Sequence, residues 1–450
     1  MKESAYDSYR ESGVQWLGEI PTHWHVTRLK HVGEAITGLT YSPEDVVAND
    51  VQGTLVLRSS NVQGGRIALD DCVYVKCDIP DKLRTRAEDI LICSRNGSRA
   101  LIGKNALVGP SLTGQTWGAF MTVFRTPDAP FLYWIMNSPI FAYQAATFLT
   151  STINQLTIGD LNNFEVPAPP ASERSAIAAF LNRETSKIDA LIEAQLRLID
   201  LLKEKRQAVI SHAVTKGLDP TTPMKDSGVE WLGELPAHWK VLPLKRDLAF
   251  LTSGSRGWAE HYADEGALFI RIGNLTRDTV DLNLADIQRV AVPPGAEGER
   301  TRVKPGDVLF SITAFLGSVA VVPNDVEDAF VSQHVALARP AQVSLLPRWI
   351  GYVTLSRVGK TQLEMGGYGG TKVQLALGDV GDLLMTAPPL EEQALILRAL
   401  EHQLTLFSDL MSEAESAVRL LHERRSALIS AAVTGKIDVR GHVPEQVEAA

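Results

Sequence analysis

Two stretches of the sequence carry basic side chains and no acidic ones. Residues 90–127 contain Arg95, Arg99, Lys104 and Arg125, and residues 329–363 contain four further basic residues. Arginine and asparagine side chains bind base edges and phosphates of nucleic acids, and the segment SRNGSR at 94–99 has the composition of a loop. These stretches are candidates for nucleic-acid contact, although the plainer interpretation of any one of these side chains is a solvated turn.

The net charge of the whole chain argues against nucleic-acid binding, in contrast to these two basic stretches. The 450 residues carry a net charge of −9, the opposite sign from that expected of a free-standing nucleic-acid-binding protein. Residues 1–219 hold 22 basic and 24 acidic residues, and residues 220–450 hold 22 and 29, so most of the acidity lies in the second half. We therefore expect the isolated chain to bind DNA weakly.

The sequence has no recognisable motif for catalysis or metal binding. HExxH, CxxC, the phosphate-binding loop, the dinucleotide-binding GxGxxG and GxSxG are all absent. Three cysteines, Cys72, Cys77 and Cys93, form neither a disulfide framework nor a zinc spacing, which fits a reducing compartment. His23 and His238 occupy equivalent positions, and we expect packing roles for both. The absence of these motifs favours a protein without catalytic activity. The alternative is an enzyme whose active site has no recognisable sequence motif.

The sequence contains the same frame twice. SGVQWLGEIPTHWHV at 12–26 returns as SGVEWLGELPAHWKV at 227–241, with eleven of fifteen positions identical. LLKEKRQAVISHAVTKGLD at 201–219 returns as LLHERRSALISAAVTGKID at 420–438, with eleven of nineteen identical. The segments between them match only faintly, as in RSSN at 58–61 and RIGN at 271–274. A tandem duplication with shared frames and different middles fits the recognition of two different targets.

A long amphipathic helix is predicted near the end of each copy. Each follows a Pro-Pro pair, at 169–170 or 388–389, after which about forty residues pass without Gly or Pro. Hydrophobic residues recur every seven positions, which is the pattern of a coiled-coil seam. The seam residues are Leu181, Ile188, Leu202, Val209, Leu400, Phe407, Leu421 and Leu428. We expect the two helices to pair, antiparallel if the halves are related by a two-fold axis; the alternative is that each packs only on its own domain.

The middles of the two copies have the pattern of mixed α/β globules. Short β-rich runs at 53–57, 89–93, 267–272 and 307–312 are separated by clusters of Gly, Asn, Asp and Pro. We expect twisted, mostly antiparallel sheets. The predicted fold class is α+β, with two pseudo-symmetric mixed globules joined by two long helices.

These motifs together resemble those of a known family. The repeated SGVxWLGExPxHWxV motif, the PPxxE turns at 169–173 and 388–392, and the long helices ending in AVTKGLD and AVTGKID resemble the specificity subunits of type I restriction-modification systems. The resemblance spans nearly the whole chain. It implies target-recognition domains at 1–171 and 218–390, conserved spacer helices at 172–217 and 391–437 that run antiparallel as a coiled coil, and a polar tail at 438–450.

The resemblance implies a DNA-binding subunit without catalytic residues. Each target-recognition domain is expected to read one half of a bipartite double-stranded DNA site, and the helix pair is expected to set the unread spacer. The implied partners are adenine methyltransferase subunits, two of them, and restriction or translocase subunits. S-adenosylmethionine, ATP and Mg are expected on those partners, and no cofactor or metal on this chain. The competing hypothesis is a tandem-repeat scaffold that does not bind DNA.

Candidate DNA contacts follow from the same resemblance. The strand, glycine-containing loop and strand that begin at 89 give Arg95, Asn96, Arg99 and Lys104. The counterpart that begins at 307 has no basic residue in its loop, so Gln333, His334 and Lys372 are chosen there. The further candidates are Arg58, Asn61, Arg271, Asn274, Arg302 and Lys304.

The amino-terminal sequence has no apolar run of the kind found in export signals. No uninterrupted apolar stretch in the chain is long enough to span a membrane. We therefore expect a cytoplasmic protein.

Overall fold

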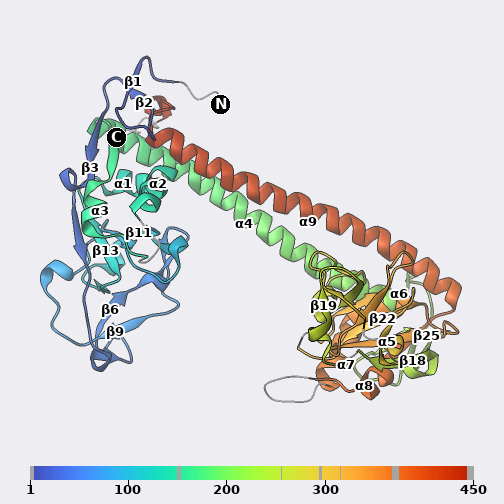
Figure 1. Ribbon diagram of the computed structural model, residues 1–450. Coiled ribbons are helices and arrows are strands. Elements are labelled where there is room, and N and C mark those ends of the chain that lie inside the picture. Colours follow the sequence, from blue (N-terminus) through green and yellow to red (C-terminus); the bar gives the residue numbers. More distant parts are fainter. Residues whose placement is uncertain are drawn as a thin grey trace. The chain divides into compact units, whose positions relative to one another are not determined.

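The computed structural model describes residues 5–148, 154–254, 256–292, 296–314, 316–366 and 374–442 (Figure 1). The chain divides into two compact units. The first combines Met1–Gln195 with Ser416–Ala450, and the second is Leu196–Glu415. The boundaries between the units fall inside the two long helices, so each unit contains a globule and a part of both helices.

Two four-stranded sheets form most of the globule of the first unit. The strands are β1 (Tyr9–Glu11), β2 (Glu19–Pro21), β3 (His25–Arg28), β4 (Glu34–Thr37), β5 (Val46–Val47), β6 (Thr54–Leu57), β7 (Val62–Gln63), β8 (Arg66–Ile67), β9 (Val73–Val75), β10 (Ile90–Cys93), β11 (Asn105–Leu107), β12 (Thr116–Trp117), β13 (Met121–Arg125) and β14 (Glu165–Ala168). One sheet, in the order β11-β10-β13-β4, is antiparallel throughout. The other has the order β12-β6-β9-β5, in which β12 and β6 are parallel.

The globule of the second unit repeats this topology. Its strands are β15 (Met224–Asp226), β16 (Glu234–Pro236), β17 (Lys240–Pro243), β18 (Leu248–Ser253), β19 (Tyr262–Ala263), β20 (Ala267–Ile270), β21 (Arg289–Val290), β22 (Val308–Ser311), β23 (Val319–Val321), β24 (Ala329–Val331), β25 (Val335–Pro340) and β26 (Leu384–Ala387). The sheet orders are β23-β22-β25-β18, again antiparallel, and β24-β20-β21-β19, again with one parallel pair, β20 and β24. The two middles, which barely match in sequence, therefore share one fold.

Short helices cover the sheets in both units. In the first unit they are α1 (Ala129–Met136), α2 (Pro139–Phe148) and α3 (Ile158–Asn163), and in the second α5 (Ala296–Thr301), α6 (Pro347–Leu355), α7 (Arg357–Gly366) and α8 (Leu377–Asp382). Together with the long helices α4 (Ala171–Lys216) and α9 (Leu390–Val433), they confirm the prediction of an α+β fold with mixed sheets and two long helices.

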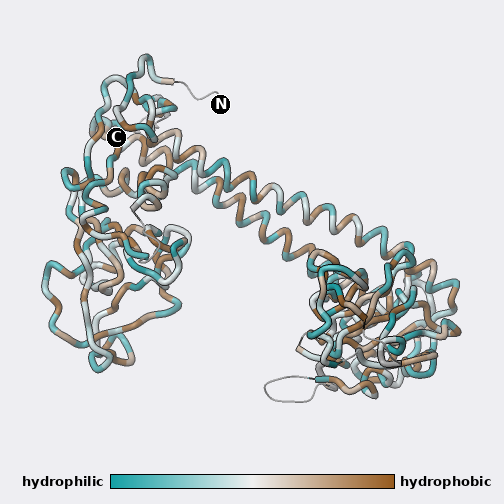
Figure 2. Tube along the Cα trace, in the orientation of Figure 1, coloured by the Kyte–Doolittle hydropathy of each residue, from teal (hydrophilic) through white to brown (hydrophobic). Residues whose placement is uncertain are grey.

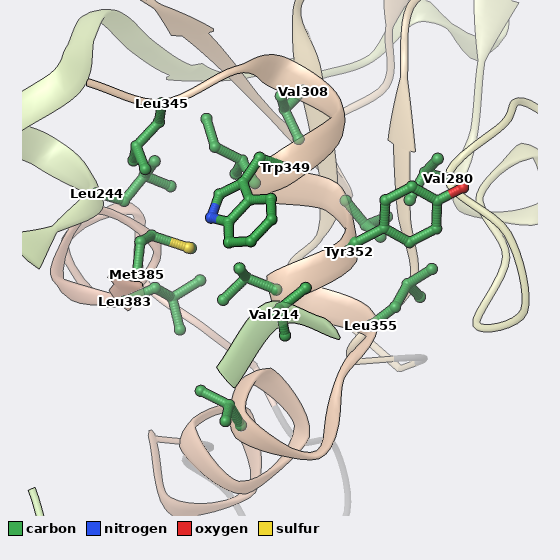
Figure 3. Packing of buried hydrophobic residues seen from close by; sticks show 14 of the residues in the cluster. Val214, Leu244, Val280, Val308, Leu345, Trp349, Tyr352, Leu355, Leu383 and Met385 are labelled. Atoms are coloured by element: carbon green, nitrogen blue, oxygen red, sulfur yellow. The ribbon is translucent and has the colours of Figure 1, made fainter. Parts of the chain in front are cut away.

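The core of the second unit is organised around Trp349 of α6. Its indole is fully buried, and Nε1 donates a hydrogen bond to the carbonyl oxygen of Thr386 at 2.7 Å. Figure 3 shows this ring among the side chains of Leu244, Met385 and Val214, all members of the same hydrophobic cluster. Val214 belongs to α4, so the end of that helix is part of the globule's core.

The two long helices run antiparallel within each unit. In the first, Arg425 of α9 donates to Asp189 of α4 at 2.8 Å, and the end of α9 shares a hydrophobic cluster with the start of α4. In the second, Thr386, just before α9, donates to the carbonyl of Val214, near the end of α4, at 2.7 Å. The helices contact each other, which confirms their antiparallel pairing, and their ends also pack on the globules. The alternative, in which each helix packs only on its own domain, is therefore not observed.

The eight predicted seam residues all lie on the protected side of the helices. Three are buried and five are half-buried. The flanks of the seam on α4 differ, since Ile192 and Ile199 are buried whereas Leu191 and Leu198 are 52% and 42% exposed. Figure 2 shows the corresponding alternation of hydrophobic and hydrophilic residues along both helices.

The duplicated motifs meet at the start of each long helix. Glu173, the third residue of α4, is buried and accepts hydrogen bonds from Trp24 Nε1 at 2.9 Å and from the hydroxyl of Tyr6 at 3.0 Å. His23 Nε2 lies 2.7 Å from the same carboxylate. The partially positive amino end of a helix also stabilises a carboxylate in its first turn. Burial beside this carboxylate raises the pKa of Tyr6.

The second copy makes the same arrangement with fewer partners. Glu392, the third residue of α9, accepts from Trp239 Nε1 at 3.0 Å, and His238 Nε2 lies 2.8 Å away. In each copy the His-Trp pair and the glutamate of the PPxxE turn lie about 150 residues apart in sequence and contact each other in the fold.

The residues after α9 pack on the first unit. Tyr9 donates to the carbonyl of Gly435 at 3.0 Å, and the guanidinium of Arg440 lies 4.9 Å from the ring of Tyr6. Val439 is only 1% exposed. The segment expected to be a polar tail from 438 onwards therefore begins with packed residues, because they cover the aromatic side chains of the amino-terminal frame.

Adjacent substitutions on α4 test which flank of the seam is packed. Ile192→Ala is expected to cost about 2 kcal/mol of stability, because it removes buried methylene groups and leaves a cavity. Leu191→Ala, on the exposed flank, should change stability by about 0.5 kcal/mol or less. Urea unfolding of the two variants measures both, and equal losses would contradict the assignment of the flanks.

Candidate functional site

The first unit contains an open hollow of about 1190 Å³ at one end of its antiparallel sheet. Its lining comes from the loop after β10, the residues before β13, the turn after β6 and the segment after β4. Arg58, Arg95, Asn96, Lys104 and Phe120 are among the lining residues. No acidic residue is among the described side chains that line it. The hollow therefore suits an anionic or acceptor-rich ligand.

Hydrogen bonds fix the loop that carries Arg95 and Asn96. The backbone N–H and the hydroxyl of Ser94 both donate to the carbonyl of Phe120, at 3.1 and 3.0 Å. Asn96 Nδ2 donates to Ser59 Oγ at 2.8 Å. Lys104 Nζ donates to the carbonyls of Ser59 and Val62. The loop and the turn after β6 are thus held together as one wall.

Arg95 and Phe120 form a cation–π pair within the hollow. The guanidinium carbon lies 5.0 Å from the centre of the ring, at a distance typical of a cation–π contact. Phe120 is 58% exposed, which is unusual for a phenylalanine without a partner surface. The guanidinium makes no hydrogen bond or ion pair with the described part of the chain. Arg58, by contrast, pairs with Asp71 at 2.9 Å.

Two of the sequence candidates face the interior. Asn61 and Asn274 are 0% and 2% exposed. Asn61 Oδ1 accepts from the N–H of Arg58 at 2.9 Å, and its Nδ2 donates to the carbonyls of Ala68 and Asp71. Asn274 makes the same three bonds in its own turn. We correct their assignment from DNA contact to turn formation, because every one of these polar atoms is already used.

The other candidates outside the hollow are scattered. Arg99 donates to the carbonyl of Ala146 at 3.0 Å and does not line the hollow. Lys304 is exposed, and Lys372 lies outside the described residues. Gln333 and His334 are neighbours before β25, with Nε2 atoms 3.2 Å apart.

Two arginine candidates of the second unit already have acidic partners. Arg271 pairs with Asp286 at 3.0 Å. Arg302 pairs with Asp328 at 2.8 Å and with Glu299 at 3.2 Å. An unpaired guanidinium is therefore a feature of the Arg95 position and not of these two.

Part of the basic charge in the acid-free stretches is structural. Arg125 forms two hydrogen bonds with buried Asp89, at 2.8 and 2.7 Å, and Arg339 forms the same two with buried Asp307. The hydrogen bonds to Asp89 raise the pKa of Arg125 above its ordinary value. The carboxylates lie outside the stretches in sequence but beside these arginines in space, so both arginines are corrected to structural roles.

Phe120 was not among the residues predicted from the sequence to contact DNA. Its signal was available, because aligning the segment from Asp89 to Arg125 with that from Asp307 to Arg339 sets Phe120 against the chosen His334. The shorter loop after β22 conceals this correspondence in a simple comparison of the two sequences.

Within the described ranges, no group of three or more His, Cys, Asp or Glu side chains is placed to hold a metal ion. In the same residues, no helix has the length and apolar character needed to cross a membrane.

Comparisons with known proteins agree on one family, although no family model matches the chain. The chain is 24% identical over 438 residues to the type I restriction enzyme EcoKI specificity subunit of Escherichia coli K12, covering 93% of this chain and 90% of that one. It is also 24% identical to the putative type I restriction enzyme MjaX specificity subunit of Methanocaldococcus jannaschii, covering 94% and 96%.

Solved structures share the fold. A chain from a structure of complex assembly and conformational transition of the type I R-M system has a TM-score of 0.72 at 18% identity, covering 93% of this chain and 99% of that one. The HsdS subunit from Thermoanaerobacter tengcongensis has a TM-score of 0.51 at 18% identity, covering 93% and 98%.

The structural role assigned to Asn61 can be tested locally. Asn61→Ala should cost about 2 kcal/mol, because the N–H of Arg58 and two carbonyls lose their buried partner. Hydrogen exchange of residues 58–71 should accelerate accordingly. Ser60→Ala, an exposed neighbour in the same turn, is the control and should leave exchange unchanged. Unaltered exchange in Asn61→Ala would return this residue to the set of possible ligand contacts.

Proposed function

We infer that this chain belongs to the specificity subunits of type I restriction-modification systems, and we propose that it selects the DNA sequence on which such a system acts. Relatives named as specificity subunits match along nine-tenths or more of both chains. The shared fold extends over a similar share of the solved chains. The subunit itself supplies recognition and assembly, and no catalytic group.

The observation that carries this proposal is one sheet topology that appears twice with different exposed side chains. Both units have the same strand order and the same carboxylate at the start of a long helix. Their loops differ, as in the basic segment 94–104 and its uncharged counterpart at 312–318. Two like scaffolds with unlike loops fit the reading of two different halves of one DNA site.

The charge of the chain points to help from partners. The net charge of −9 disfavours tight binding to a polyanion by this chain alone, since phosphate contacts supply most nonspecific affinity. We propose that methyltransferase subunits provide much of the phosphate contact. Two copies of the frame suggest two such subunits, one for each copy.

The remaining partners and ligands follow from the same proposal. Restriction or translocase subunits would join when the system cleaves DNA. S-adenosylmethionine, ATP and Mg would bind to the partner subunits. The cytoplasm, where bacterial and archaeal chromosomes lie, is the expected location. A tandem-repeat scaffold that does not touch DNA is not favoured, because the curated relatives are specificity subunits.

Co-expression with the adenine methyltransferase of the same system tests the proposal. The purified complex should methylate adenine in host DNA within one bipartite motif, and the isolated chain should bind DNA weakly and with strong salt dependence. Sequencing that detects methylated adenine gives the motif. Methylation without a bipartite motif, or the same motif in a complex that lacks this chain, would contradict the proposed role.

The continuous helix α4 leads from one unit into the other, so its length is proposed to govern the unread spacer. Deleting residues 193–199 together with 415–421 removes one heptad from each helix and keeps the seam in register. Seven helical residues span about 10 Å, which corresponds to about three base pairs.

The expected result of this double deletion is a shortened spacer between unchanged half-sites, or loss of methylation at the original site. Deleting seven residues from one helix only is the matched control and should disrupt assembly, because the two seams no longer align. Continued methylation of the original motif by the double-deletion variant would exclude the role of the helices in spacing.

A further inference from the structure

Backbone hydrogen bonds place the hollow of the first unit in correspondence with the second unit, residue by residue. The corresponding bonds are Ser94 N to Phe120 O with Ile312 N to His334 O, and Cys93 N to Lys104 O with Ser311 N to Ser318 O. The isolated β-bridge between Arg95 and Gln155 likewise recurs between Thr313 and Gln374. The two loops therefore occupy the same place in the same fold, although one is four residues shorter.

This correspondence shows which chemistry is specific to the first unit. The corresponding pairs are Arg95 with Thr313, Lys104 with Ser318, and Phe120 with His334. The second unit thus lacks two cations and one aromatic hydrocarbon ring at these positions. These positions can contribute to a difference in what the two units bind, because the strands that carry them pair in the same way in both units.

Three of the four sequence candidates that line the hollow, Arg58, Asn96 and Lys104, already have polar partners within the fold. Arg58 pairs with Asp71, and Lys104 donates to two backbone carbonyls. The Asn96 amide is used on both sides, since Nδ2 donates to Ser59 and Oδ1 accepts from the N–H of Ser98 at 2.9 Å. Among these candidates, Arg95 alone presents a side chain with no polar partner in the described residues.

The position of the guanidinium over the Phe120 ring prepares Arg95 for a planar ligand edge. A guanidinium over an aromatic ring has a restricted orientation, so less conformational entropy is lost when its donors bind. The parallel donors of arginine match the O6 and N7 acceptors of guanine in the major groove. Phe120 adds an exposed apolar surface, which can contact a thymine methyl group but gains nothing from a phosphate.

We propose that Arg95, oriented by Phe120, selects a guanine in the half-site read by the first unit. This inference deepens the proposed function and depends on it. Lys104, whose Nζ donates to two backbone carbonyls, holds the wall of the hollow in place and adds positive charge beside Arg95. Thr313 and His334 give the second unit a different base preference at the corresponding position.

The decisive variant is Arg95→Lys in the complex with the methyltransferase, followed by mapping of methylated adenine in host DNA. A lysine keeps the charge but loses the two parallel donors. We expect methylation to spread to sites with another base at one G·C pair of one half-site, with discrimination at that pair falling about tenfold to a hundredfold. Phe120→Ala should weaken the same pair to a smaller extent.

Arg86→Lys is the matched control, because Arg86 is exposed in the same unit and does not line the hollow. It should leave the motif unchanged. In every variant, unchanged base selectivity in the half-site read by the second unit shows that the complex has folded and assembled.

Three results would overturn the inference. They are unchanged discrimination in Arg95→Lys, a uniform loss of methylation that affects both half-sites alike, and a recognised half-site without guanine. The first two would indicate a phosphate contact, which is tolerant of lysine or insensitive to sequence. Failure of the proposed function can be distinguished from failure of this inference, because the complex with the unsubstituted chain would then show no bipartite methylation motif.

Discussion

The fold depends on a carboxylate placed at the beginning of each long helix. Glu173 and Glu392 accept hydrogen bonds from tryptophans that precede them by about 150 residues, so each contact joins the beginning of a globule to the start of a long helix. A buried carboxylate without donors is costly, and the buried Glu173 is stabilised by the N–H of Trp24, by the O–H of Tyr6 and by the helix terminus. The frames must therefore stay alike in both copies, while the loops between them are free to differ.

A buried aspartate in each antiparallel sheet is likewise compensated by hydrogen-bonding partners. Asp89 and Asp307 lie at equivalent strand starts and each binds an arginine across the sheet with two hydrogen bonds. These pairs join neighbouring strands at the end opposite to the loop 94–104 and its counterpart 312–318, because Ile90 pairs with Phe124 and Cys93 with Met121. Both units therefore keep the same ion pair at one end of the sheet, while the loops at the other end differ.

The sequence predicted the duplicated frames, the heptad seam and the class of fold, because these depend on local pattern and on spacing along one helix. It could not decide between Leu191 and Ile192, since either flank of a seam can face the partner. Asn61 was misassigned because an asparagine that closes a turn and one that contacts a ligand have the same local sequence. Phe120 became visible only when strand neighbours were known, since Arg95 lies 25 positions before it and contacts it at the ends of the adjacent strands β10 and β13.

The division of the chain has a consequence for the order in which it can fold during synthesis. The second unit is one uninterrupted stretch, Leu196–Glu415, and all its contacts are available once that stretch has left the ribosome. The first unit lacks the α9 segment that carries Arg425 and Ile429, and the covering residue Arg440, until the second unit has been synthesised. Tyr6 and Trp134 therefore remain without these contacts while the later half of the chain is made, and the second unit completes its set of contacts before the first unit does.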